Sequence, residues 1–174
     1  MATLGQALEN LDKFINEFPI VVVKTIQENK EDIVESVREQ ISVGLDGDEK
    51  KLTPSYSADP FFSTKEAGRW KGKAKQYVKW KKDITPPARS WLGYDKRGVD
   101  TPNLYITGVF HESIKATDIP DGVRIASAGN VEFGKDIESK YGSAIFKLSP
   151  KAREFFMKHH LAPELKKLFA KYGQ

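Results

Sequence analysis

The sequence predicts an α+β fold with long N-terminal helices, a small antiparallel β-sheet built on one hairpin, and a C-terminal helix. Apolar residues recur every three or four positions near both ends of the chain, which indicates amphipathic helices there. Two short alternating runs flank a Pro-Asp-Gly turn at 120–122, which indicates an antiparallel hairpin. The length of 174 residues fits one domain with a hydrophobic core. We expect a single domain over 1–174 with an acidic helical segment (1–45), a basic helix (63–84), an extended loop (86–103) and a core of helix, hairpin and helix (104–174).

The composition excludes several classes of protein. Hydrophobic residues make up 39% of the chain and charged residues 30%, which is typical of neither a disordered nor a membrane-spanning protein. There is no cysteine, so disulfides, thiol nucleophiles and cysteine–zinc sites are excluded. No apolar run approaches the roughly 20 residues that cross a bilayer. The first ten residues lack the basic and then apolar pattern of a signal peptide. We therefore expect a soluble protein, made in a cytoplasm, without membrane contact.

Charge is distributed unevenly along the chain. Residues 1–50 hold 5 Lys and Arg against 11 Asp and Glu, whereas residues 63–98 hold 11 against 3. The first segment therefore has a net charge of −6 and the second of +8, although the whole chain carries only +4. Opposite charges on separate segments suit head-to-tail association between copies.

Two helices are predicted in the acidic segment. Thr3 and Gln6 fit a capping box that opens the first helix. Pro19 is expected to begin a second helix, because a proline at the first helical position lacks only an amide that would be unpaired there. This second helix runs to about Val43 and ends in a turn at Gly44. The apolar face of the first helix consists of Leu4, Leu8, Leu11, Ile15 and Phe18.

A basic helix and a long loop follow. Residues 63–66 form a second capping-box pattern, and the helix is expected to run from there to about Lys82, with Trp70, Tyr77 and Trp80 on one face. Pro86 and its neighbour Pro87 stop it. The loop 86–103 holds three prolines and two glycines, and long ordered loops of this kind are often functional.

The C-terminal part is predicted to contain three helices and the hairpin. A short helix covers the region around 104–114, with Thr107 as its N-cap. Strands on either side of the turn give the hairpin over 115–127. A second short helix covers about 136–141, and the last helix begins at Ser149 with a proline at its first position.

The residues that resemble a catalytic or metal site favour structural roles. His111 and Ser113 are two positions apart, so on a helix they point in different directions and cannot form a Ser–His pair. We expect Ser113 on a separate face and His111 pointing to solvent or to a neighbouring molecule. The adjacent His159 and His160 lack the spacing of zinc-protease ligands. We therefore expect no metal, no cofactor and no catalytic residue.

The basic aromatic stretch 69–82 is the strongest local feature. Its aromatic residues fall on one stripe and are expected to be buried, whereas its lysines exceed what a solvated helix needs. The lysines either contact an acidic partner, which would be a nucleic-acid backbone or an acidic protein surface, or simply lie in water on the outer side of the helix. Both alternatives remain open at this point. The residues concerned are Lys71, Lys73, Lys75, Lys79, Lys81 and Lys82.

An ordered series of short motifs resembles a known family. The series consists of T-G-x-F-x-x-S-I at 107–114, the hairpin at 115–127, a Tyr-Gly element at 141–142 and a Pro-Glu-Leu helix at 163–165. It resembles the small neck, tail-completion or head–tail connector proteins of tailed bacteriophages. The acidic N-terminal helix and the stretches GLDGDEKKLTPSYSADPFF and YVKWKKDITP resemble a subgroup from phages and prophages of gut Bacteroidetes, including crAss-like phages. The motif residues are Thr107, Gly108, Phe110, Ser113, Ile114, Tyr141 and Gly142.

The glycine of the last motif has two possible positions. It aligns with Gly142 after Tyr141, or with Gly134 in the run Glu-Phe-Gly at 132–134. The first alignment is preferred, because the Ser-Pro start of a helix follows it, and the second stays open.

The resemblance implies a structural virion protein and not an enzyme. Such proteins form homo-oligomeric rings on the portal, contact other neck and tail proteins, and carry the DNA channel toward the tail. The resemblance therefore places the chain in the virion, after synthesis in the cytoplasm of a bacterial host. The lysines of 71–82 would face the DNA channel or an acidic neighbour. Packing between subunits would involve the loop residues Trp91, Leu92 and Tyr94.

Two other classes of function make different demands on the sequence. A free, non-catalytic nucleic-acid-binding protein would use the same basic helix at 65–82. A hydrolase of cell-wall glycans would need a pair of carboxylates in a cleft. The only candidates for such a pair are Glu112 and Glu138, and their spacing does not support it.

Overall fold

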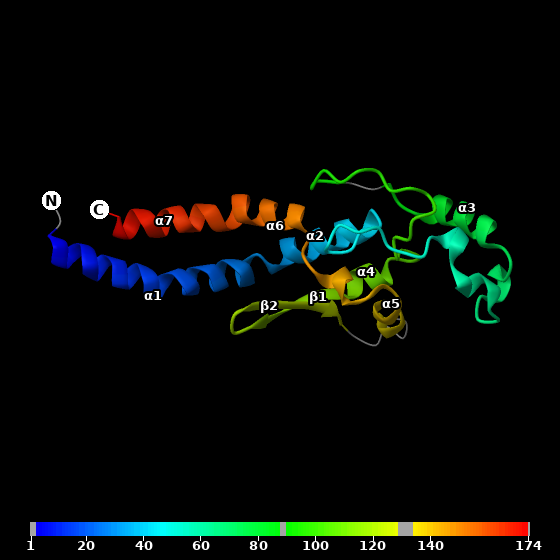
Figure 1. The fold of residues 1–174 in the computed structure, drawn as a ribbon, viewed down its shortest axis with the longest axis horizontal. Coiled ribbons are helices and arrows are strands. Elements are labelled where there is room, and N and C mark those ends of the chain that lie inside the picture. Colours follow the sequence, from blue (N-terminus) through cyan, green and yellow to red (C-terminus); the bar gives the residue numbers. More distant parts are fainter. Residues whose placement is uncertain (1–2, 88–89, 129–133, 174) are drawn as a thin grey trace.

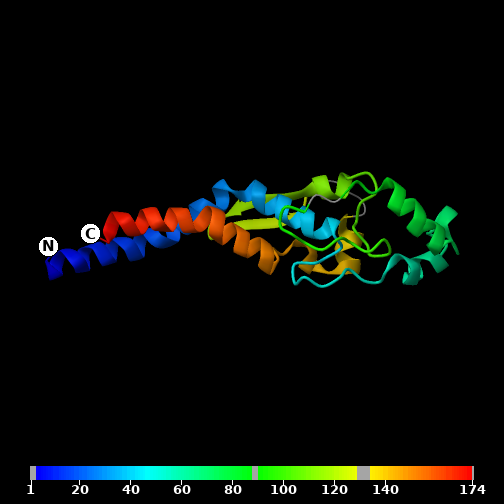
Figure 2. The same cartoon turned by 90° about the horizontal axis from the view of Figure 1, so that it is seen from above.

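The computed structural model describes residues 3–87, 90–128 and 134–173, and it confirms the α+β fold. The molecule is a rod, with the N-terminal and C-terminal helices side by side at one end and a small helical lobe at the other (Figures 1 and 2). The helices are α1 (Leu4–Glu28), α2 (Lys30–Ser42), α3 (Ala74–Ile84), α4 (Val109–Ser113), α5 (Gly134–Tyr141), α6 (Pro150–Phe156) and α7 (Ala162–Tyr172). The strands are β1 (Ile114–Ile119) and β2 (Gly122–Ser127).

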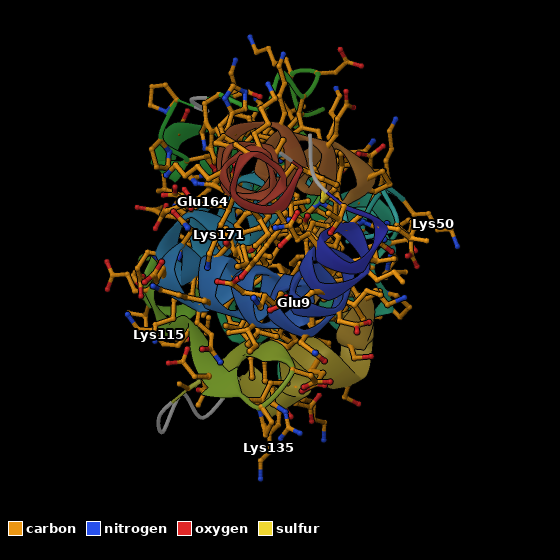
Figure 3. All side chains as sticks on the ribbon, turned by 90° about the vertical axis from the view of Figure 1, so that its left-hand side faces the viewer. Glu9, Lys50, Lys115, Lys135, Glu164 and Lys171 are labelled. Atoms are coloured by element: carbon orange, nitrogen blue, oxygen red, sulfur yellow. The ribbon has the colours of Figure 1, made fainter. Side chains whose placement is uncertain are left out.

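The end of the rod that holds both termini is formed by α7 and the first part of α1, residues 4–21, and we call this pair the stalk. The two helices run antiparallel and side by side (Figures 1 and 2). The rings of Phe14 and Phe169 lie 4.8 Å apart. The Glu17 carboxylate accepts hydrogen bonds from the Lys171 ammonium at 2.8 Å and the Tyr172 hydroxyl at 2.5 Å. Figure 3 looks along the stalk and labels Lys171 near the junction of the helices.

The predicted boundary between the first two helices is wrong. Pro19 lies inside α1 and does not begin a new helix. It is exposed, so water can take the place of its missing amide, and the helix continues past it. The break falls ten residues later, at Asn29, whose side-chain amide donates to the Thr25 carbonyl at 2.8 Å. The capping box at Thr3 and Gln6 is confirmed.

Helix α2 is the centre of the main core. Val34, Val37 and Ile41 are completely buried and pack against Phe110 and Ile114. The side chain of Gln40 is also completely buried and links α2 to the C-terminal segment through the Lys147 carbonyl at 2.6 Å. The core therefore joins the N-terminal helices to the predicted 104–174 region.

The predicted hairpin is confirmed. Strands β1 and β2 pair antiparallel, with Ile114 opposite Ser127 and Ile119 opposite Gly122, so Pro120 and Asp121 form the turn. The hairpin is tied to the long N-terminal helix, because the Gln27 amide donates to the Ile119 carbonyl at 2.9 Å.

The basic helix is shorter than predicted. The pattern at 63–66 does not start it, and α3 begins only at Ala74. The reason is that Gly68 and Gly72 have φ angles of +53° and +71°, in the left-handed region that interrupts a helix. Two short 3₁₀ turns, Pro60–Ser63 and Gly68–Trp70, take the place of the missing turns.

The C-terminal helices agree with the sequence prediction in outline. Ser149 caps α6 by accepting the Ala152 amide at 3.1 Å, with Pro150 at the first helical position. A π-helical turn, Met157–Leu161, joins α6 to α7, and Pro163 lies in the first turn of α7. Helix α5 is found where the short helix at 136–141 was predicted.

Candidate assembly and nucleic-acid interface

The lobe at the end of the rod opposite the stalk is built on an aromatic cluster. Tyr77 of α3 lies at its centre, with ring centroids 5.2 Å from Tyr56, 4.8 Å from Phe62 and 5.3 Å from Trp70 and from Trp80. Edge and tilted contacts of this kind stabilise aromatic pairs beyond simple burial. The cluster therefore fixes one face of α3 against the preceding 3₁₀ turns. Trp70, Tyr77 and Trp80 are half-buried, and not fully buried as predicted.

The opposite face of α3 presents lysines to solvent. Lys75, Lys79 and Lys82 are exposed, and at 100° per residue they fall within about 60° of one another. In the described parts of the chain, no carboxylate lies within 4 Å of any of these three ammonium groups. This lysine face is therefore a concentrated positive surface held by a rigid support.

The two lysines before the helix extend this surface, and an arginine stabilises its base. Lys71 and Lys73 are exposed and precede the first residue of α3. The Arg69 guanidinium lies 4.9 Å from the ring centre of Trp70 and 5.7 Å from that of Trp80. Cation–π contacts of this geometry hold the arginine against the cluster.

Lys81 does not belong to this surface. Its side chain is only 1% exposed, and its ammonium donates to the Tyr105 carbonyl and lies 5.5 Å from the ring centre of Tyr56. It points to the aromatic side of α3, so it cannot contact a DNA channel or an acidic neighbour. Burial lowers the pKa of Lys81 to about 8.

A cavity of about 500 Å³ opens between the aromatic cluster and the segment 104–110. Its walls are mainly aromatic and aliphatic, and burial raises the pKa of Tyr77 in these walls to about 12. At its rim the Lys140 ammonium pairs with the Asp59 carboxylate, which is 7% exposed. Because its walls are mainly apolar, the cavity is suited to holding an apolar group. Sequence reasoning missed it, since residues 59 and 140 come from distant segments.

The T-G-x-F-x-x-S-I motif folds around a left-handed glycine. Gly108 has φ +91° and precedes α4, and a Cβ on it would lie 3.3 Å from the Tyr105 ring. The side chain of Thr107 makes no capping hydrogen bond, so the prediction that it caps the helix is wrong. Phe110 and Ile114 are buried in the main core, as expected for residues that hold this segment on the hairpin.

The polar residues of the motif have internal partners. The Ser113 hydroxyl donates to the Phe110 carbonyl at 2.6 Å and lies 2.8 Å from the Ser127 hydroxyl across the hairpin. His111 does not point to solvent, because its Nε2 lies 2.8 Å from the Asn103 carbonyl. Burial of the ring lowers its pKa. Asn103 is itself completely buried and was not noticed in the sequence.

The Tyr-Gly element completes the wall of the cavity. Tyr141 lines the cavity and Gly142 follows it with φ +80°, a conformation that favours glycine. Burial raises the pKa of Tyr141 well above its ordinary value. Of the alternative Glu-Phe-Gly element, residues 132 and 133 lie outside the described residues, and Gly134 is the first residue of α5.

One of the contacts that tie the extended loop to the body is made by a buried carboxylate. In its described part, the loop 86–103 has no helix or strand. The Glu39 carboxylate accepts the Ser90 hydroxyl at 2.7 Å and the Leu92 amide at 3.1 Å. The sequence carries little signal for this role, because a glutamate in an acidic helical segment is expected to face solvent.

The three loop residues predicted at a subunit interface differ in exposure. Tyr94 is 8% exposed and its hydroxyl bonds Ser149, so it belongs to the core of this chain. Leu92 is half-buried. Trp91 is 45% exposed although it packs on Phe155 at 4.5 Å, and it is the residue of the three with the most surface left for a neighbour.

Comparisons with known proteins add nothing to this geometry. No family model, curated protein or solved structure matches the chain. Within residues 3–87, 90–128 and 134–173, no group of three or more His, Cys, Asp or Glu side chains is placed to hold a metal ion. None of the helices in these ranges combines the length and apolar character needed to cross a membrane.

Proposed function

We propose that this chain is a structural, non-catalytic virion protein of a tailed phage. In this proposal it forms a homo-oligomeric ring in the neck, as a head–tail connector or tail-completion component, and joins the portal to the tail around the DNA channel. The family comes from the resemblance of the motif series at 107–142 and its flanking stretches. Assembly is the part of the proposal that the geometry supports.

One observation carries the proposal: the two ends of the rod present different surfaces that this chain does not itself cover. The stalk exposes apolar residues of α1, whereas the other end exposes the lysine face of α3. Contiguous apolar exposure marks interaction sites in soluble proteins. Unlike surfaces at opposite ends suit a subunit that is held by neighbours on more than one side.

The lysine face would contact a polyanion in the assembled particle. Lys75, Lys79 and Lys82 can contact phosphates without reading base sequence, which is what the wall of a DNA channel requires. An acidic neighbour is the other source of negative charge, since residues 1–50 carry a net charge of −6. Either contact orders copies around an axis.

Electron microscopy of the purified protein with its portal tests the proposal. We expect ring-shaped density added to one end of the portal, and copies of this chain in purified virions by mass spectrometry. Failure to join the portal, together with absence from the virion, would contradict the proposed function.

The lysine face also favours a second candidate, a free nucleic-acid-binding protein. The test is the affinity for duplex DNA as a function of salt, for the wild type and a variant with Lys75, Lys79 and Lys82 changed to Glu. A matched control changes three exposed lysines elsewhere on the chain, Lys115, Lys135 and Lys166.

If the chain binds DNA freely through α3, the variant loses about three phosphate contacts and the log–log salt slope falls by about 3, while the control keeps its slope. Tight salt-dependent binding by the isolated chain, with no association to the portal, would favour this second candidate over the neck protein.

A further inference from the structure

The first part of α1 carries an apolar stripe that the described residues of the chain leave exposed. The five side chains remain well exposed although α7 packs alongside. Their exposed fractions are 79% for Leu4, 55% for Leu8, 51% for Leu11, 57% for Ile15 and 38% for Phe18. Single exposed apolar residues are ordinary on a protein surface, but a continuous row of five is not.

The spacing of the stripe suits a covering helix. Its members follow one another at intervals of four, three, four and three residues, which over this length fits both the period of an amphipathic α-helix and the 3.5-residue repeat of a coiled-coil seam. A helix that packs against a flat or globular surface needs only a broad apolar face. A strict alternation of four and three keeps one narrow row facing a partner helix along its whole length.

The position of the stripe around α1 points to a bundle. The face that α7 contacts includes Phe14, Glu17 and Val21, which are half-buried. At 100° per residue, the stripe lies about 100° around the helix from that face. In a four-helix bundle each helix contacts two neighbours at roughly such an angle. Helix α7 therefore fills one of two neighbouring positions around α1, and the stripe faces the other.

We infer that the stripe packs against the stalk of a second copy of this chain. Phe169 of α7, which is 57% exposed, adds to this apolar surface. If a large side chain has an area of roughly 150–250 Å², the exposed fractions of the six residues correspond to on the order of 600 Å². A stable interface uses about 800 Å² on each partner. The stripe thus supplies most of one self-complementary interface.

Charge favours a second stalk over other apolar partners. In residues 4–20 of α1 the charged side chains are Glu9, Asp12 and Glu17 against Lys13, a net charge of −2. In α7 they are Lys166, Lys167 and Lys171 against Glu164, a net charge of +2. Within one copy Lys13 pairs with Glu9, Lys167 with Glu164 and Lys171 with Glu17. The opposite charges that remain for a second stalk are Asp12 on α1 and Lys166 on α7.

The inference rests on the proposed function for the need to self-associate. A self-complementary contact joins copies in pairs, so a ring also needs a second contact elsewhere on the rod. The test is sedimentation equilibrium of the full chain for the wild type, Ile15→Lys and Ile20→Lys. Ile15 lies in the stripe, whereas Ile20 is 64% exposed on nearly the opposite side of α1, so it is a matched control. Circular dichroism checks that both variants stay folded, which is expected because both side chains are exposed in the single chain.

We expect the wild type and Ile20→Lys to sediment at two or more times the 19.6 kDa of one chain. Ile15→Lys should weaken association at least about 100-fold, because it buries a charge without a partner. A wild type that stays monomeric at 100 μM, roughly a hundred times a micromolar dissociation constant, would overturn the inference. Equal weakening of association by the two substitutions would also overturn it. So would a finding that the stripe binds the portal but no second copy.

This test and the test of the proposed function can fail separately. Self-association through the stripe in a protein that never joins the portal would leave the inference standing and remove the phage role. A chain that is monomeric alone could still enter the virion, with Ile15→Lys having no effect on this incorporation. That outcome would keep the phage role and remove the inference about the stripe.

Discussion

Two successive helices of this chain carry similar apolar patterns but differ strongly in how much of each is buried. Helix α2 buries seven of its 13 residues, whereas α1, with 25 residues, buries only Thr25. Both patterns have helical spacing, so periodicity alone does not distinguish them. The difference lies in what the rest of the chain places around each helix. The hairpin and the C-terminal segment surround α2, but α7 covers only one side of α1. An amphipathic pattern therefore predicts that a face will be covered, and not that the same chain will cover it.

The largest expected effect comes from removing matched apolar groups from the two helices. Ile41→Ala should lower the free energy of unfolding by about 2–5 kcal/mol, because it leaves a cavity in the main core. Leu8→Ala, made in the Ile15→Lys background so that the stalk is uncovered, should change it by no more than about 0.5 kcal/mol. Chemical denaturation of both variants measures the contrast. Similar losses at the two sites would break the comparison between α1 and α2.

The next effect contrasts a lysine in the body of the molecule with one on the stalk. The pKa of Lys81 is lowered to about 8 by burial, so between pH 8 and its unfolded value of 10.5 the unfolded chain binds more protons. Its charged ammonium therefore destabilises the fold fully below pH 8, and the penalty disappears as the pH rises to 10.5.

Lys81→Met should accordingly raise the free energy of unfolding by about 3 kcal/mol at pH 7, and by clearly less at pH 9.5. Lys13→Met on the exposed face of α1 is the control and should show no such gain at pH 7. Urea denaturation at the two pH values measures this. A stabilisation by Lys81→Met that is equal at pH 7 and pH 9.5 would show that lost packing and not charge determines its effect.

The smallest effect compares the caps of a buried and an exposed helix end. Ser149 is completely buried, caps α6 and bonds the Tyr94 hydroxyl, whereas Thr3 caps α1 in solvent. Ser149→Ala should cost about 1–2 kcal/mol of global stability. Thr3→Ala should only increase hydrogen exchange in the first turn of α1. Global destabilisation by Thr3→Ala as large as that by Ser149→Ala would show that the stalk folds as one unit with the body.

Local rules predicted the features that depend on neighbours in sequence. The capping box at Thr3, the hairpin turn at Pro120 and the cap at Ser149 each involve residues within a few positions of one another, and the structure confirms them. The helix boundary at Pro19 was wrong because an exposed proline can be tolerated inside a helix. The start of α3 was wrong because Gly68 and Gly72 adopt left-handed angles that composition does not reveal.

The candidate interface was only partly predictable for the same reason. The lysines of α3 and its aromatic stripe could be read from the sequence, but the burial of Lys81 depends on Tyr105, which is 24 positions away. Tyr94 likewise became a core residue through Ser149. These contacts join distant segments, and spacing along the chain does not report them.

The central claim is that the stalk of a second copy covers the α1 stripe, and single cysteines test it most directly. The chain contains no cysteine of its own, so any disulfide must involve the introduced residue. Leu11→Cys places a thiol at the middle of the stripe, and Ile20→Cys places one on the other side of α1. Under mild oxidation, Leu11→Cys should form a covalent dimer in high yield and Ile20→Cys should remain monomeric. Equal yields from the two variants, or no dimer from Leu11→Cys, would contradict the claim.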